Sequence, residues 1–181
     1  MKKLRFLIVL LFVFMFVVFF KPVTKTIMKA IYPLRYENYI VKYSNEYNLD
    51  KYLVMAIIKA ESNFIYDAHS GYAKGLMQIT PNTFEWIANK LSLDYSTTDI
   101  LNPETNIKMG CYYMRYLLDY FNQNEKLSIC AYNAGMGNVN KWLKNPDYSK
   151  SGTTLDFIPF EETNKYYNKI KNSIDIYKKL Y

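Results

Sequence analysis

Helix-start signals and a helical spacing of aromatic residues constrain the fold of this chain most. Thr80-Pro81 and Asn102-Pro103 each place a side-chain acceptor directly before a proline, the pattern of a helix N-cap followed by proline in the first turn. Between residues 36 and 47, four tyrosines and one isoleucine recur at intervals that put them on one helix face. No alternating pattern typical of strands persists after residue 35. The sequence therefore predicts an all-α body.

The same reasoning sets the expected element boundaries. Asp50 is a candidate N-cap for a helix whose inward face carries Leu53, Ile57 and Ala60. Gly135 is placed to end another helix. Polar residues fill 63–75 and turn-forming residues are frequent in 145–159, so both segments are expected to be loops. The expected helices cover Lys51–Ser62, Thr80 to about Leu91, Asn102–Phe121, Glu125–Ala134, 137–144 and Glu161–Leu180.

An unbroken apolar run, Phe6–Phe20, follows Lys2, Lys3 and Arg5. As a helix it would span roughly 22 Å, which flanking lysines and local thinning could fit to a hydrocarbon core of about 30 Å. The basic end predicts an N-terminus in the cytoplasm and a body outside it. We predict a single-pass signal-anchor over residues 1–21, a juxtamembrane linker over 22–34 and one domain over 35–181. A cleaved signal peptide is the alternative, although no small-residue cleavage site follows the run.

The net charge of +7 comes almost entirely from the amino-terminal segment. Six of the 23 basic residues precede Arg35, which leaves 17 against 16 acidic residues in the body. This balance does not support a nucleic-acid partner. One histidine and two cysteines do not make a metal cluster, and no phosphate-binding glycine motif occurs. Cys111 and Cys130 are expected to be buried free thiols, with a disulfide between neighbouring helices as the alternative.

Four short segments carry residues that a helical core does not need: 61–64, 75–79, 131–137 and 158–163. Glu61 ends a predicted apolar helix, where the helix dipole and apolar neighbours would raise its pKa and suit it to proton donation. Asn133 precedes two glycines, which would let a ligand approach the backbone closely. The alternatives are an exposed glutamate in a last helical turn and an ordinary glycine C-cap.

Taken together, a series of short motifs resembles the lytic transglycosylases of glycoside hydrolase family 23, in the lysozyme superfamily. The resemblance covers roughly residues 36–178. Between Ser70 and Gly75 the chain is one residue shorter than the S-x-x-G-A-x-G usual in that family. The motifs are ESNF at 61–64, Ala68 with Ser70, GLMQI-x-P at 75–81, NPETNI at 102–107, AYNAG-x-G-x-V at 131–139 and IPF-x-ET-x-x-Y at 158–166.

The resemblance implies a lysozyme-like catalytic domain that acts on peptidoglycan glycan strands without a metal or cofactor. Glu61 would be the sole catalytic acid and base. Ser70 would contact Glu61 or the substrate, Tyr166 would orient Glu61, and Glu162 would contact the peptide stem. The glycan groove would be lined by Gln78, Tyr132 and Asn133. We expect a monomer attached to the cell membrane.

The implied reaction is non-hydrolytic. Glu61 would protonate the β-1,4 bridging oxygen between N-acetylmuramic acid and N-acetylglucosamine, and then deprotonate the C6 hydroxyl to leave a 1,6-anhydro end. Asp67, the nearby carboxylate, is expected to be a turn residue. A hydrolytic muramidase of the same fold and a non-catalytic, membrane-anchored wall-binding protein remain alternatives.

Overall fold

A computed structural model of the chain describes residues 11, 15 and 23–181. Apart from two isolated positions, the predicted anchor over residues 1–21 lies outside the described residues. Within the described residues, no helix is long and apolar enough to cross a membrane. The named elements are α2 (Glu37–Glu46), α3 (Lys51–Glu61), β1 (His69–Ser70), β2 (Ala73–Lys74), α4 (Pro81–Lys90), α5 (Pro103–Tyr120), α6 (Glu125–Ala134), α7 (Met136–Leu143) and α8 (Glu161–Leu180).

The helices begin where side-chain caps predict. Asp50 accepts a hydrogen bond from the Tyr52 backbone N–H at 2.8 Å, which caps α3. The Thr80 hydroxyl and the Asn102 amide oxygen each accept from the N–H three residues on, at 3.3 and 3.1 Å. Both caps are followed by proline in the first turn of the helix. The expected boundaries of the body helices agree with the structure to within one or two residues.

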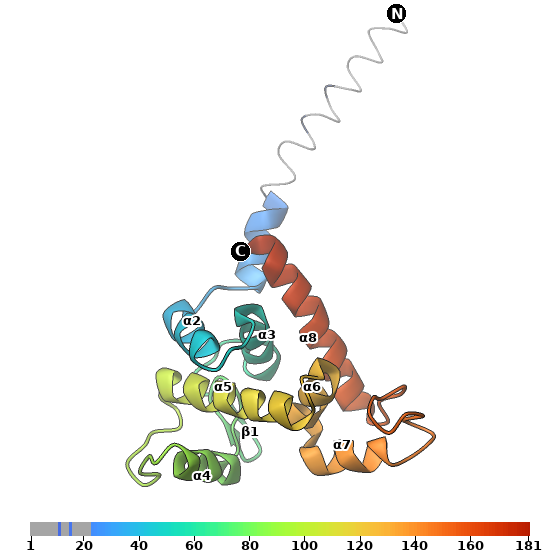
Figure 1. The fold of residues 1–181 in the computed structure, drawn as a ribbon. Coiled ribbons are helices and arrows are strands. Elements are labelled where there is room, and N and C mark those ends of the chain that lie inside the picture. The colour runs from blue at the N-terminus through green and yellow to red at the C-terminus, as the bar shows by residue number, and fades with distance from the viewer. Residues whose placement is uncertain (1–10, 12–14, 16–22) are drawn as a thin grey trace, which may run out of the picture.

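The helices pack around α5, which runs across the middle of the body (Figure 1). Helices α2, α4 and α6 all contact α5, and α3 packs along α8. One hydrophobic cluster joins α2, α3, α4, α5 and α8. A second cluster lies between α5, α6, α7 and the segment leading to α8. This packing fixes the C-terminal end of α3 against the first half of α8, two segments that are far apart in sequence.

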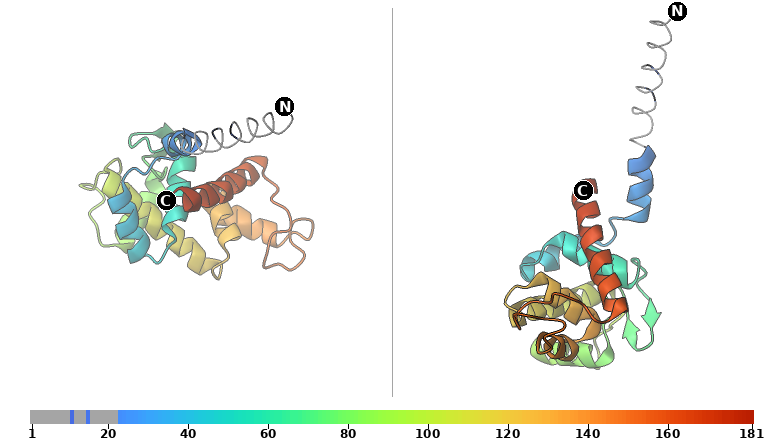
Figure 2. Two further views of the ribbon diagram at one scale, coloured as in Figure 1. Left: turned by 90° about the horizontal axis from the view of Figure 1, so that it is seen from above. Right: turned by 90° about the vertical axis from the view of Figure 1, so that its right-hand side faces the viewer.

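Two segments differ from the expected loop and linker. Residues 23–31 form a helix that leads toward the end of the body where α8 finishes (Figures 1 and 2). The expected loop over 63–75 contains a two-stranded hairpin, in which Ser70 pairs with Ala73. Strands of two residues are too short to produce an alternating pattern. Cys111 and Cys130 are both buried free thiols, so the disulfide alternative is wrong.

Candidate active site

Glu61 lies at the C-terminal end of α3 and is half-buried against α8. Its carboxylate accepts a hydrogen bond of 2.6 Å from the Tyr166 hydroxyl of α8. Burial raises the pKa of Glu61 from 4.5 to about 7, against the opposing effects of the Tyr166 hydrogen bond and the positive charge of Lys169. The Lys169 ammonium is held nearby, because it donates to the Ala60 carbonyl at 3.0 Å. A carboxyl with this pKa can donate or accept a proton near neutral pH.

Two tyrosines, the buried Tyr166 and the partly buried Tyr132, stand beside this carboxyl as neutral hydrogen-bond donors. Burial raises the pKa of both Tyr132 and Tyr166 well above its ordinary value, and the nearby charge of Glu61 raises it further. The Tyr132 hydroxyl donates to the Met77 carbonyl at 2.9 Å, which joins α6 to the loop before α4. Tyr132 thereby connects the environment of Glu61 to the neighbouring cleft.

Gln78 occupies a left-handed backbone position, with φ of 47°. Its side-chain amide donates to the carbonyls of Ala68 and Gly75 at 2.9 and 2.8 Å. The other end of the side chain, Oε1, is buried and has no hydrogen-bond partner among the described residues. A buried acceptor without a partner is costly, so a donor on a bound ligand would satisfy it.

The loop that carries Gln78 is fixed by a buried asparagine of α5. The Asn106 amide oxygen accepts from the Met77 backbone N–H at 2.7 Å, and its amide nitrogen donates to the Lys74 and Ile100 carbonyls. Gly75 approaches this side chain so closely, with φ of 79°, that a Cβ there would overlap the Asn106 amide. The glycine of the GLMQI motif is therefore required by packing.

Asn133 is held from α8. The Thr163 hydroxyl, which is buried, donates to the Asn133 amide oxygen at 2.7 Å. This bond leaves the amide nitrogen of Asn133 without a hydrogen-bond partner among the described residues. The side chain can therefore donate to a ligand in the cleft.

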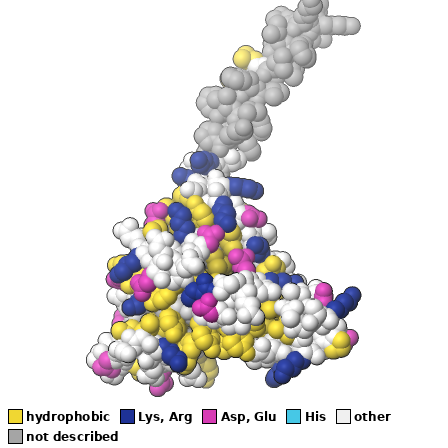
Figure 3. All heavy atoms as spheres, in the orientation of Figure 1, with side chains coloured by type: hydrophobic (Ala, Val, Ile, Leu, Met, Phe, Trp, Pro, Cys, Tyr) yellow, Lys and Arg dark blue, Asp and Glu magenta, His cyan; other side chains and the backbone are white. Residues whose placement is uncertain are grey.

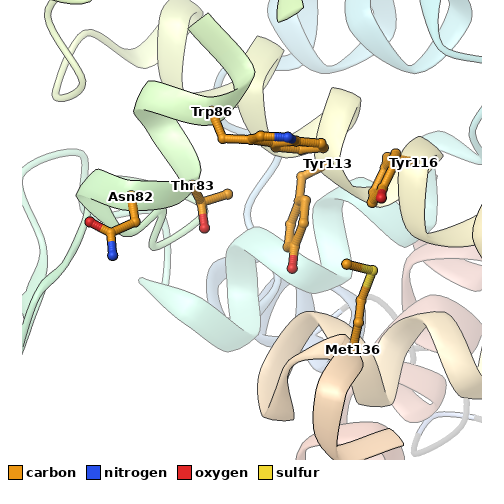
Figure 4. Close-up of a pocket in the computed structure, with 6 residues that line it drawn as sticks. All are labelled: Asn82, Thr83, Trp86, Tyr113, Tyr116 and Met136. Atoms are coloured by element: carbon orange, nitrogen blue, oxygen red, sulfur yellow. The ribbon is translucent and has the colours of Figure 1, made fainter. Parts of the chain in front are cut away.

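Two adjoining cavities form the cleft, which we call the groove. The first, of about 240 Å³, has Gln78, Tyr132 and Asn133 in its lining. The second, of about 310 Å³, shares Thr83 and Tyr113 with it. Figure 4 shows the aromatic and sulfur side chains of the second cavity gathered between α4, α5 and α7. Its lining consists of Asn82, Thr83, Trp86, Tyr113, Tyr116 and Met136.

Two predicted site residues stay at the surface. Ser70 is exposed in β1 and makes no side-chain hydrogen bond to Glu61 or to any other described residue. Glu162 is exposed in the first turn of α8. The structure thus brings Glu61 together with Tyr166 and Tyr132, and joins Tyr132 to Gln78 and Asn133 through the groove. Among the described residues, no group of three or more His, Cys, Asp or Glu could hold a metal ion.

Comparison with known families adds a decisive observation. The Transglycosylase SLT domain family matches residues 38–154, which is most of the chain. The chain belongs to this family.

The SLT domain of this chain has curated relatives of much greater length. The soluble lytic murein transglycosylase of Escherichia coli (strain K12) is 34% identical over 143 residues, which are 77% of this chain and 22% of the relative. The membrane-bound lytic murein transglycosylase C of Photorhabdus laumondii is 34% identical over 107 residues, which are 53% of this chain and 30% of the relative. The chain thus spans less than a third of each of these two proteins.

Solved structures share the fold of the SLT domain. The structure of a 70-kDa soluble lytic transglycosylase in complex with bulgecin A superimposes with a TM-score of 0.74 at 30% identity, over 83% of this chain and 25% of that one. An inactive mutant of the lytic transglycosylase Slt from Pseudomonas aeruginosa, with glutamine in place of a glutamate, gives 0.72 at 31% identity, over 82% and 24%.

Sequence reasoning missed two positioning residues of this SLT domain, Thr163 and Asn106. Both lie inside quoted motifs, IPF-x-ET and NPETNI, and both are buried polar side chains on helices. Asn106 bonds to Met77 and Lys74, and Thr163 bonds to Asn133, at separations of 29 to 32 residues. No local sequence pattern indicates such a pairing. The available signal was a polar residue at an inward-facing helical position.

Proposed function

We propose that this chain is a peptidoglycan lytic transglycosylase in which Glu61 acts first as the acid and then as the base. The observation that carries the proposal is the half-buried Glu61 carboxyl, with a pKa of about 7 and a hydrogen bond from Tyr166. Membership of the SLT domain family and the relatives named as murein transglycosylases support the same chemistry.

In the proposed first step, protonated Glu61 gives its proton to the β-1,4 bridging oxygen between N-acetylmuramic acid and N-acetylglucosamine. The bond from that oxygen to the anomeric carbon breaks, and the N-acetyl oxygen of the muramic residue stabilises the carbon. In the second step, ionised Glu61 removes the proton of the C6 hydroxyl, whose oxygen bonds to the anomeric carbon. Glu61 ends protonated again, and no water is consumed.

The surroundings of Glu61 favour this route over a two-carboxylate hydrolysis. Among the described residues, no second carboxylate contributes to the pKa shift of Glu61, and the two cavities of the groove have no carboxylate in their lining, Glu61 included. Gln78, Tyr132 and Asn133 would hold the glycan, while Ser70 and Glu162 would contact the substrate from the rim. A hydrolytic muramidase with one carboxylate would differ in its product.

We also propose that the chain is anchored in the cell membrane with its catalytic domain outside the cytoplasm. The support is the apolar run Phe6–Phe20 behind three basic residues. Fractionation of cells with amino-terminal sequencing tests this. Mature protein that is released into the medium and begins between residues 21 and 35 would contradict the anchor.

Mass analysis of muropeptides tests the catalytic proposal. The full chain in a mild detergent should release products with anhydro ends, lighter by one water than the reducing ends that a hydrolase leaves. Glu61→Gln should lose at least the 10²- to 10⁴-fold that positioned acid–base catalysis typically contributes. Glu85→Gln, at an exposed position on α4, is the matched control and should keep full activity. Reducing ends would favour the muramidase, and full activity of Glu61→Gln would refute the mechanism.

A further inference from the structure

A separate cavity lies where the helix over residues 23–31 meets the catalytic domain. It has a volume of about 370 Å³ and shares no lining residue with the groove. The last turn of α3 and the residues that follow it form one wall, and the amino-terminal segment forms the other. Its lining consists of Ala30, Ile31, Pro33, Arg35, Lys59, Asn63 and Ile65.

The cavity is positively charged. Arg35 and Lys59 both line it, and no lining residue is acidic. Arg35 makes no hydrogen bond or ion pair with another described residue, and Lys59 donates to the Asn63 side chain at 2.5 Å. Burial and the nearby charge of Lys169 lower the pKa of Lys59. An anion in the cavity would pair with both cations, and it would offset the unfavourable environment of Lys59.

An exposed aliphatic stripe borders this charged cavity. Val23, Ile27 and Ile31 are spaced by four residues on one helix face, with 55%, 53% and 48% of their surface exposed. Ile65, across the cavity, is 51% exposed. A stripe of aliphatic side chains beside cationic ones is typical of a helix that lies at a lipid surface. Figure 3 shows Lys and Arg side chains gathered at this end of the molecule.

The amino-terminal segment is held firmly against the end of α8. The Lys29 ammonium lies 5.0 Å from the ring centroid of Tyr181, and the rings of Tyr32 and Tyr177 meet edge to face at 5.4 Å. The Tyr181 hydroxyl donates to the Tyr32 carbonyl at 3.0 Å. The cavity is therefore a fixed part of the domain surface.

We propose that this cavity binds the phosphate-bearing headgroup of an anionic diacyl phospholipid, with the aliphatic stripe against its acyl chains. The apolar run in the sequence ends at Phe20, three residues before Val23, so a lipid surface is the expected neighbour. The first acidic residue in the sequence is Glu37, so nothing in this segment would repel an anionic headgroup. A zwitterionic headgroup would bring its own cation near Arg35 and Lys59.

The lipid contact would set the distance between the groove and the bilayer surface. Helix α8 starts beside the groove, where Thr163 holds Asn133, and ends beside Tyr32. Its 20 residues correspond to a length of about 30 Å. Helices α4 and α7, which flank the groove, lie at the end of the body opposite the helix over 23–31 (Figure 1). A lipid-bound domain would thus reach glycan strands that lie some distance from the bilayer surface.

The inference rests on the proposed membrane attachment. Short-chain lipids, which are free in solution, test lipid binding without requiring that attachment. The full chain in detergent is titrated with dihexanoyl-phosphatidylglycerol, dihexanoyl-phosphatidylcholine or inorganic phosphate, and native mass spectrometry counts the bound molecules. Phosphatidylglycerol should bind at least about tenfold more tightly than the other two. The combined change Arg35→Gln and Lys59→Gln should weaken it by about 10- to 30-fold.

Two further variants keep the test decisive. Lys90→Gln with Lys144→Gln removes two exposed charges elsewhere and should leave phosphatidylglycerol binding unchanged. Arg35 is exposed and makes no hydrogen bond or ion pair within the described residues, so the fold of Arg35→Gln should survive by circular dichroism, with binding about fivefold weaker. Equal binding of the two lipids, unchanged binding in the Arg35 and Lys59 variants, or competition by inorganic phosphate at equal concentration would overturn the proposal. No readout depends on catalysis.

Discussion

Replacing Glu61 by Gln should make the stability of this domain less dependent on pH. Below pH 4.5 the Glu61 carboxyl is protonated in both the folded and the unfolded chain, so its burial carries no ionisation cost. Between pH 4.5 and about 7 the unfolded chain ionises first, and the free energy of unfolding falls. Above pH 7 the loss is complete. Gln keeps the size of the side chain and an oxygen that accepts from Tyr166, but it never ionises.

The magnitude follows from the two pKa values. A rise from 4.5 to about 7 corresponds to at most about 3 kcal/mol of unfolding free energy. Partial access of solvent to the Glu61 carboxyl reduces this figure. Relative to the wild type, Glu61→Gln should be stabilised by about 1–3 kcal/mol at pH 8.5 and by about zero at pH 4.

Thermal denaturation followed by circular dichroism measures this difference. The full chain, Glu61→Gln and the exposed control Glu85→Gln are compared in the same detergent at pH 4, 5.5, 7 and 8.5. The melting temperature of Glu61→Gln should exceed that of the wild type by several degrees at pH 8.5, whereas the control should follow the wild type throughout. A Glu61→Gln variant that gains nothing at high pH, or gains more at pH 4, would refute the raised pKa.

Three substitutions test Tyr166, which holds the Glu61 carboxyl, and the hydrogen-bonded pair of Thr163 and Asn133 at the groove. Tyr166→Phe removes a hydrogen bond that stabilises ionised Glu61, so the high-pH limb of kcat/KM should move to higher pH, with activity at pH 7 lower by about 10- to 150-fold. Asn133→Ala should lower kcat/KM by about 5- to 150-fold with an unchanged circular dichroism spectrum; an unfolded variant would make Asn133 structural instead. Thr163→Val should lower kcat/KM by about 2- to 12-fold. In the Asn133→Ala variant the same change should lower it by almost nothing, because the two residues act through one hydrogen bond.

Local signals were sufficient for the helices of the body. The caps at Asp50, Thr80 and Asn102 act within three residues of the helix start, so the information lies in adjacent sequence. The helix over residues 23–31 had no such signal. Its docked end depends on contacts between Tyr32 and α8, about 145 residues away in sequence. No local sequence pattern indicates such contacts.

The site was less accessible to local reasoning than the helices. The position of Glu61 at the end of an apolar helix indicated a raised pKa, and burial is the principal cause of that shift. Tyr166 lies 105 residues from Glu61, and its orienting role came only from the family resemblance. Ser70 was expected to contact Glu61 or the substrate, and the exposed hairpin after α3 leaves its side chain at the surface without a hydrogen bond to Glu61.

One carboxyl can serve in both proposed steps because some of its surroundings favour the protonated form and others favour the ionised form. Burial favours protonated Glu61, as the first step requires, while the Tyr166 hydroxyl and the Lys169 charge favour the ionised form that the second step requires. With a pKa of about 7, neither form costs much to reach at neutral pH. The neighbouring phenols stay neutral, because burial keeps the pKa of Tyr132 and Tyr166 far above this range. Tyr166 can hold the Glu61 carboxyl, and Tyr132 the loop at Met77, without competing for the transferred proton. The balance between protonated and ionised Glu61 is therefore set by side chains that do not themselves change charge.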